Sequence, residues 1–215
     1  IAAGVGTAGF VGAAAPHPSG LSRWWNDPKN VFSARRFWTR AILPCIYLEG
    51  PDGAGKSTLA DTLAERLGLR VVQTDDPPSS WRECLRRVER RVAPGLVCDR
   101  SSGLLSELVY GPVMRGGTIA DEGEVWRVVR AVCRSVLVVQ CRPPLDRLKP
   151  SSRRGESRSH ARAVRGRLDQ LYRRYDEVMS ETRQLGGTVV EYDWTKQSVD
   201  DLVRSIGIRG TYKRG

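Results

Sequence analysis

The chain has 215 residues and a mass of 23.9 kDa, the size of one ordinary domain or of one domain with an appendage. Hydrophobic residues make up 40% and charged residues 27%, which excludes a disordered chain, and no apolar run is long enough for a transmembrane helix. The formal net charge of +11 favours anionic partners, and nucleotides, nucleic acids and acidic membranes all fit it.

Residues 1–43 differ from the rest and are predicted to form an N-terminal arm. The stretch from Ile1 to Ala15 is small, apolar and rich in glycine, and no basic segment precedes it, so it matches a secretory signal poorly. Aromatic and basic residues then alternate at Ser22–Trp25 and at Phe32–Arg40. We expect either an arm that docks on the domain through its aromatic residues or a contact surface for nucleic acid or a partner.

Residues 44–215 alternate between short apolar segments and amphipathic ones. Strands are predicted at 45–48, 70–73, 96–98, 136–139 and 188–192, and helices at 56–67, 80–92, 103–110, 121–132, 161–181 and 199–206. Near-continuous apolar strands with helical crossovers indicate a parallel sheet covered on both faces. The predicted fold is therefore α/β, a doubly wound parallel five-stranded sheet with helices on both faces.

The strongest motif is a phosphate loop between the first of these strands and the helix that follows it. Gly50-Pro51-Asp52-Gly53-Ala54-Gly55-Lys56-Ser57 fits the pattern G-x-x-x-x-G-K-[ST]. Backbone N–H groups of such a loop and the helix N-terminus form a concave anion site. Lys56 is expected to reach the β- and γ-phosphates of ATP, and the Ser57 hydroxyl to hold Mg²⁺.

A second motif, Asp99-Arg100, follows the predicted strand 96–98. Ligands of α/β sheets bind at the carboxyl ends of the strands, beside the phosphate loop. Asp99 is therefore expected to hold Mg²⁺ through water, and Arg100 to grip a phosphoryl group. The alternative is a surface ion pair.

The segment from Arg142 to Arg174 carries most of the excess positive charge of the chain. Its first half has the composition of a loop and predicts an Arg-rich lid at about residues 149–160, with Arg153 and Arg154 (and Arg158) as candidates to contact a triphosphate. A solvated charged face is the alternative, and a GC-rich genome would also raise the arginine content.

Glu49 to Thr58 resembles the phosphate loop of thymidylate kinases and related deoxynucleoside kinases, with Asp52 typical of the thymidylate kinase branch. Asp99-Arg100-Ser101 and the segment Ser106–Gly111 resemble phage-encoded members, as do Tyr175-Asp176 and Tyr192-Asp193-Trp194. The likeness spans roughly residues 44–206. One departure concerns the acceptor: where thymidylate kinases usually have Arg-Glu-Pro, this chain has Asp75-Asp76-Pro77.

The resemblance implies site residues in three groups. ATP would contact the loop residues Gly50, Asp52, Gly53, Ala54, Gly55, Lys56, Ser57 and Thr58. Catalysis would involve Lys56, Asp52, Asp99, Arg100, Arg153 and Arg154, with Ser57 and Asp99 at the metal. The acceptor would lie against Arg100, Tyr110, Asp75 and Asp76, and the departure at these last two residues makes a hydroxyl acceptor conceivable.

The sequence therefore predicts a P-loop kinase that uses ATP and Mg²⁺ to phosphorylate a nucleoside monophosphate or a nucleoside. One alternative is a phage kinase that acts on a modified thymidine, of the 5-hydroxymethyluracil type, within DNA, which the positive charge would suit. A non-catalytic nucleotide-binding module is the other. The five cysteines form no CxxC pair, so we expect the cytoplasm (that of a host if the protein is phage-encoded), and the resemblance raises the prospect of a homodimer.

Overall fold

The structure is a computed structural model that describes residues 4–5, 11–12, 45–73, 78–99, 103–148 and 158–206. Within the predicted N-terminal arm it describes two short strands, β1 (Gly4–Val5) and β2 (Val11–Gly12), which pair antiparallel. Most of that arm, and residues 149–157 of the predicted lid, lie outside the described residues. The last part of the predicted lid, from residue 158, is already helical.

The remaining elements alternate along the chain as the apolar pattern predicts. The strands are β3 (Cys45–Glu49), β4 (Arg70–Val72), β5 (Leu96–Cys98), β6 (Val136–Cys141) and β7 (Thr188–Tyr192). The helices are α2 (Lys56–Leu67), α3 (Trp81–Arg91), α4 (Leu104–Tyr110), α5 (Glu122–Val132), α6 (Arg158–Arg165), α7 (Leu168–Gln184) and α8 (Val199–Ser205), with a π-helical turn η2 (Gly111–Arg115) and a 3₁₀ turn η3 (Leu145–Arg147).

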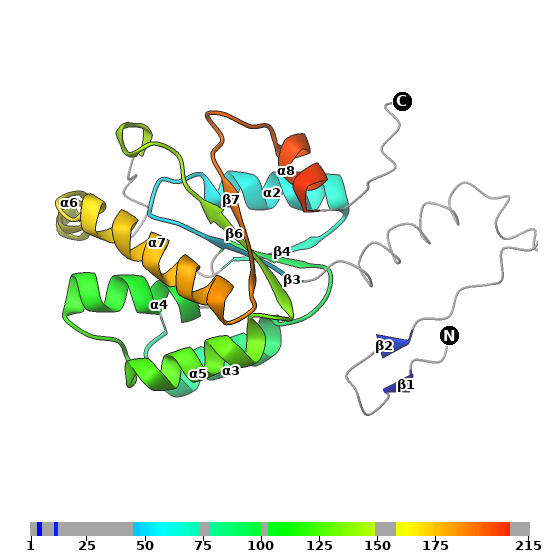
Figure 1. Cartoon of the computed structure of the whole chain (residues 1–215), viewed down its shortest axis with the longest axis horizontal. Helices are drawn as coiled ribbons and strands as arrows, with labels where there is room; N and C mark the ends of the chain where they lie inside the picture. The colour runs from blue at the N-terminus through cyan, green and yellow to red at the C-terminus, as the bar shows by residue number, and fades with distance from the viewer. Residues whose placement is uncertain are drawn as a thin grey trace, which may run out of the picture.

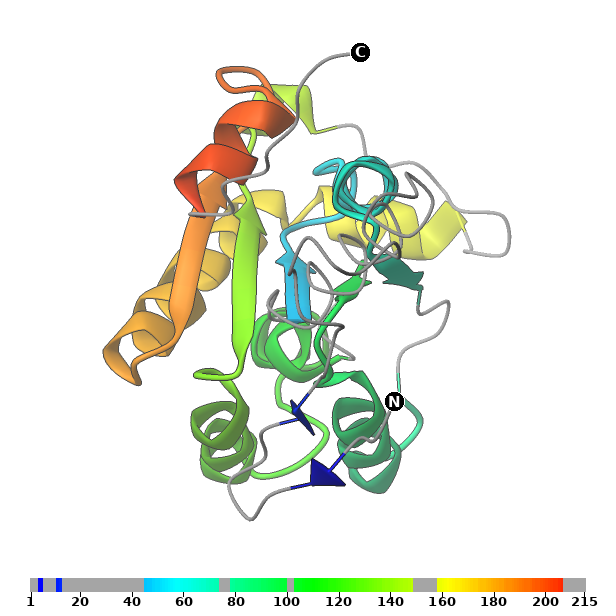
Figure 2. The same ribbon diagram turned by 90° about the vertical axis from the view of Figure 1, so that its right-hand side faces the viewer.

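The five strands β3 to β7 form one parallel sheet in the order β4-β5-β3-β6-β7. Figure 2 shows them side by side, from β7 in orange to β4. The central strand β3 pairs with β5 on one side and with β6 on the other, in register Tyr47 with Cys98 and Tyr47 with Val138. The segments that follow β5 and β6 therefore flank the loop that follows β3.

Alternate residues of the strands enter two separate cores, one on each face of the sheet. Tyr47 and Val138 pack against α3, α4, α5 and α7, whereas Ile46 and Val139 pack against α2 and α8. Figure 1 shows α2 and α8 above the sheet and α3, α4, α5 and α7 below it. This confirms the predicted parallel sheet with helices on both faces. The strands β3 and β6 are buried along their whole length because they lie between the two cores, which explains their near-continuous apolar sequences.

The helix predicted at 161–181 is wrong as a single element. The chain forms α6 and α7 instead, interrupted at Gly166 and Arg167, where Arg167 leaves the helical region with φ −124°. Glycine inside a helix is unfavourable, and the break lets the Arg167 guanidinium donate to the carbonyl of Val113 at 2.6 Å. An amphipathic pattern continues across such a break, because Val164 and Leu171 are both buried in the same core.

Within the described ranges, no helix has both the length and the apolar character that crossing a membrane requires. All five cysteines are buried and unbridged, and they serve as small apolar residues of the two cores.

Candidate active site

The phosphate loop joins β3 to α2, as its sequence predicts. Gly50, at the end of β3, has φ +148°, and a Cβ on it would lie 2.4 Å from the carbonyl oxygen of Cys141. Gly53 and Gly55 also have positive φ, of 83° and 85°. Only glycine takes these conformations without strain, so the glycines allow the backbone to curl tightly around the N-terminus of α2.

Lys56, the first residue of α2, folds back over this loop. Its ammonium Nζ donates to the carbonyl oxygens of Gly50 and Pro51 at 2.7 and 2.8 Å, and the residue is 7% exposed. The Lys56 ammonium is thus buried beside the loop, at the N-terminus of α2. The loop thus presents both N–H donors and a cation to an anion.

Ser57 and Asp99 meet beside the loop from neighbouring elements. The Ser57 hydroxyl donates to Oδ2 of Asp99 at 2.7 Å, and Asp99 is only 3% exposed. The parallel pairing of β5 with β3 brings Asp99, the residue after β5, to the start of α2.

A hydroxyl and a carboxylate are the hard oxygen donors that Mg²⁺ prefers. Among the described residues, no cluster of three or more His, Cys, Asp and Glu side chains could hold a metal by itself. Proteins usually bind Mg²⁺ through one or two protein ligands, while phosphate and water supply the rest. Ser57 and Asp99 therefore fit this ion.

Tyr110 closes the other side of the loop. The backbone N–H of Asp52 donates to its hydroxyl at 3.2 Å, and its ring meets that of Tyr175 edge-on, with centroids 6.3 Å apart. Tyr175 is 2% exposed. Burial, together with the nearby Tyr110, Glu49 and Asp52, raises the pKa of Tyr175 well above its usual value, so this hydroxyl stays neutral under the loop. The predicted acceptor residue Tyr110 thus lies at the loop.

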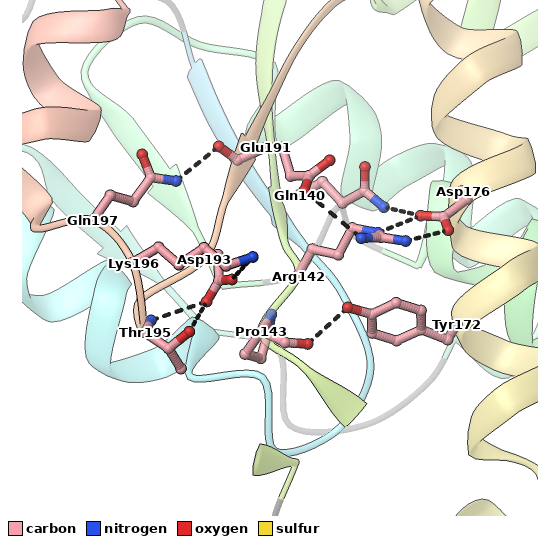
Figure 3. Close-up of polar contacts among 10 residues, drawn as sticks. All are labelled: Gln140, Arg142, Pro143, Tyr172, Asp176, Glu191, Asp193, Thr195, Lys196 and Gln197. Carbon is pink, nitrogen blue, oxygen red and sulfur yellow. Dashed lines mark hydrogen bonds and ion pairs between the residues drawn. The ribbon is translucent and has the colours of Figure 1, made fainter. Parts of the chain in front are cut away.

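A residue that sequence reasoning did not place at the site, Trp194, lies against the loop from the C-terminal part of the chain. A Cβ on Gly55 would be 3.5 Å from Cδ1 and Nε1 of the indole, and Trp194 is 43% exposed. The turn that holds it is built on buried Asp193, whose carboxylate accepts from the N–H and the hydroxyl of Thr195 at 2.9 and 2.6 Å (Figure 3). The only sequence signal for this residue is the resemblance of Tyr192-Asp193-Trp194 to phage-encoded kinases, and that resemblance does not place the indole at the loop.

The end of β6 is clamped onto α7 next to this turn. Arg142 donates to both oxygens of Asp176 at 2.8 Å, and its guanidinium lies 4.7 Å from the ring centroid of Tyr172 (Figure 3). Gln140 donates to the same carboxylate at 2.9 Å. Burial disfavours the charged form of Asp176, but the bonds from Arg142 and Gln140 outweigh it and lower the pKa of this carboxyl.

The structure thus brings together most of the residues predicted for the donor side. Lys56, Ser57, Asp99, Asp52 and Tyr110 lie around the loop. Within the loop and just after it, Ala54 is buried, whereas Gly53 and Thr58 are exposed. The predicted residues Asp75, Asp76, Arg100, Arg153 and Arg154 lie outside the described residues.

No protein-family model matches the chain. Among curated proteins it is 44% identical over 63 residues to a 2-phosphoglycerate kinase from Pyrococcus horikoshii, an alignment that covers 29% of this chain and a fifth (20%) of that protein. Among solved structures, the YorR protein of Bacillus subtilis in complex with phosphorylated GDP superimposes with a TM-score of 0.57 at 22% identity, over 79% of this chain and 99% of that one. Shikimate kinase from Acinetobacter baumannii gives a TM-score of 0.49 at 19% identity, over 83% and 99%.

The fold is accordingly a five-stranded parallel sheet with a phosphate loop after its central strand, and the YorR protein shares it. This confirms the fold class predicted from sequence.

Proposed function

We propose that the chain is a P-loop phosphotransferase that moves the γ-phosphoryl group of ATP to a nucleoside monophosphate or a nucleoside. The observation that carries the proposal is the arrangement of Lys56, Ser57 and Asp99 around a glycine-rich loop, with the Ser57 hydroxyl 2.7 Å from the Asp99 carboxylate. The fold is shared with the YorR protein, whose structure holds phosphorylated GDP, and this supports a nucleotide as one substrate.

Positioning and charge account for the catalysis in this proposal, because phosphoryl transfer demands little covalent chemistry of the protein. The loop N–H groups and the N-terminus of α2 hold the β-phosphate. The Lys56 ammonium donates hydrogen bonds to the carbonyls of Gly50 and Pro51 in the absence of ATP. When ATP binds, it donates to the phosphate oxygens instead and offsets the charge that develops during transfer. Ser57 and, through water, Asp99 would hold a magnesium ion, which would supply further neutralisation of phosphate charge.

The nucleobase of ATP is assigned a place against the indole of Trp194. Its ring lies beside Gly55, close to where the phosphates enter, and is 43% exposed on a fixed turn. An indole face stacks on any nucleobase and reads no base edge, which predicts similar use of adenine and guanine nucleotides.

The acceptor is assigned to the opposite side of the loop, where Tyr110 contacts the Asp52 backbone. The resemblance of Asp52 and of Ser106–Gly111 to thymidylate kinases favours a deoxynucleoside monophosphate there. The net charge of +11 favours a second acceptor, a nucleoside within a DNA strand.

The test is transfer of labelled phosphate from ATP in the presence of Mg²⁺, with acceptors offered in parallel. The panel holds the four deoxynucleosides, their monophosphates, 2-phosphoglycerate, and single- and double-stranded DNA with and without 5-hydroxymethyluracil. Label on a monophosphate or a nucleoside supports the main proposal, and label on DNA alone supports the second.

Lys56→Ala, which removes the ammonium, should abolish transfer to any acceptor. Arg86→Ala, which removes one positive charge from an exposed position on α3, is the matched control and should retain full activity. Near-normal turnover of Lys56→Ala, or ATP hydrolysis that no acceptor stimulates, would overturn the assignment.

A further inference from the structure

A groove with a volume of about 570 Å³ lies between α5 and α7, apart from the phosphate loop. Its lining comprises Trp126, Arg127 and Arg130 of α5 together with Glu181, Gln184 and Leu185 at the end of α7. These helices lead into β6 and β7, so their C-terminal ends lie where those strands begin (Figure 1). The phosphate loop lies at the opposite edge, where the strands end. The groove is therefore a separate feature from the candidate active site.

The charge of this groove is mainly positive. Among the described residues, neither Arg127 nor Arg130 forms an ion pair, although both guanidiniums line the same hollow. Arg134 extends the row, since its Nε would lie 3.2 Å from a Cβ on Gly186, just beyond α7. Glu181 is the one carboxylate among the described lining residues.

Arg174, on the same helix α7, shows the contrasting arrangement. Its guanidinium is bound at 2.6 Å by Glu122 and at 3.1 Å by Glu177. Two carboxylates thus neutralise one arginine between α5 and α7, whereas in the described part of the chain the guanidiniums of Arg127 and Arg130 have no such partners. Guanidinium groups offer planar pairs of donors that suit phosphate oxygens.

Trp126 and Leu185 provide the apolar part of the groove. Both are half-buried and pack against the core on this face of the sheet, so part of the indole remains available to a ligand. Gln184 and Glu181 add groups that can hydrogen-bond to a base edge. A flat apolar surface beside two guanidiniums suits a planar ring that carries a phosphate, and the volume lies within the usual range for small-molecule sites.

We propose that this groove is a second site, for a base–phosphate unit. The unit is either a free mononucleotide or one nucleotide of a single strand. The proposal does not depend on the function proposed for the phosphate loop.

The experiment measures fluorescence anisotropy on the full-length chain with two probes, a fluorescent adenosine monophosphate and a short end-labelled oligodeoxythymidylate. All variants carry Lys56→Ala, which removes the contribution of the phosphate loop. We expect this background to bind at least one probe. Arg127→Ala with Arg130→Ala should then weaken binding by at least about tenfold, since two charge-assisted contacts to phosphate are lost.

Arg86→Ala with Arg90→Ala is the matched control. It removes two arginines from exposed positions on a helix of the same face, and we expect binding to change by less than about twofold. Trp126→Leu keeps an apolar side chain and removes the stacking surface, so it should weaken binding by at least about fivefold. Circular dichroism establishes that each variant is folded.

The two probes distinguish the sources of the ligand. Binding of the monophosphate identifies a free nucleotide, whereas binding of the oligonucleotide alone, with a steep loss in salt, identifies a strand. Absence of binding in the Lys56→Ala background would overturn the proposal, as would equal losses in the two double variants. Phosphate transfer by Arg127→Ala with Arg130→Ala, on an intact Lys56, should match that of the unaltered chain, which separates this test from that of the proposed function.

Discussion

Replacement of Gly50 by alanine tests whether the close approach of the phosphate loop to β6 is an essential part of the site. The new Cβ would lie 2.4 Å from the carbonyl oxygen of Cys141, far inside the 3.4 Å at which ordinary van der Waals contact begins. That oxygen belongs to the backbone of β6, which pairs with a strand on each side, so it cannot rotate away. The backbone at residue 50 must also keep φ near +148°, which an alanine tolerates poorly.

Both effects destabilise the folded state. A non-glycine residue in such a conformation costs about 1–3 kcal/mol, and a forced shift of packed atoms costs a similar amount, about 1–3 kcal/mol. We therefore expect Gly50→Ala to lower the free energy of unfolding by about 3 kcal/mol or more. Because the relief must come from displacement of the loop, ATP binding should be lost as well.

Gly116→Ala is the matched control for this prediction. Gly116 also has a positive φ, of 78°, but a Cβ on it meets no atom of the described residues within 4 Å. Only the conformational penalty applies, about 1–2 kcal/mol. Urea unfolding followed by circular dichroism gives both values, and isothermal titration with ATP gives the binding. Equal destabilisation of the two variants would refute the reasoning, because the contact with Cys141 would then contribute nothing.

Three further predictions concern the chemistry of the site. Ser57→Ala should raise the Mg²⁺ concentration needed for half-maximal phosphate transfer by about tenfold, because a hydroxyl ligand beside Asp99 is lost; an unchanged Mg²⁺ titration contradicts the metal assignment. Trp194→Leu should raise KM for ATP and GTP alike, by about fivefold or more, and a rise for ATP alone would show that the indole is not a general stacking surface. Asp176→Asn should reduce the loss of unfolding free energy at acid pH. The pKa of Asp176 is lowered in the folded state, so its pair with Arg142 stabilises the protein above about pH 4. This stabilisation is lost as the pH falls below that value, and the variant has none of it to lose. Equal acid sensitivity of Asp176→Asn and the unaltered chain, in urea unfolding from pH 3 to 7, would contradict that pairing.

The sheet and the donor side of the site could be predicted from sequence because their signals are local. Each strand of the sheet is a short apolar run, and the phosphate loop is a continuous motif whose glycines stand at the positions with φ > 0. Asp99 was predicted at the loop because the carboxyl ends of all strands in a parallel sheet lie at the same edge, and both Asp99 and the phosphate loop follow such an end.

The break between α6 and α7 could not be predicted in the same way. The apolar positions Val164 and Leu171 keep a helical spacing across it, and a single Gly166 only weakens a helix. At the break, Arg167 donates to the carbonyl of Val113, a contact between segments far apart in the chain that a local sequence pattern does not predict.

The position of Trp194 shows how the topology completes the site. Its turn follows β7, an edge strand that is two places away from β3 in the sheet. The adjoining strand β6 bridges that gap: its end contacts Gly50 through the Cys141 carbonyl, and the N–H of Arg142 donates to the Tyr192 carbonyl at 2.8 Å. Because β6 is held on both sides by backbone contacts, the turn after β7 is fixed relative to the phosphate loop, and the indole reaches Gly55 without any motif that joins them in sequence.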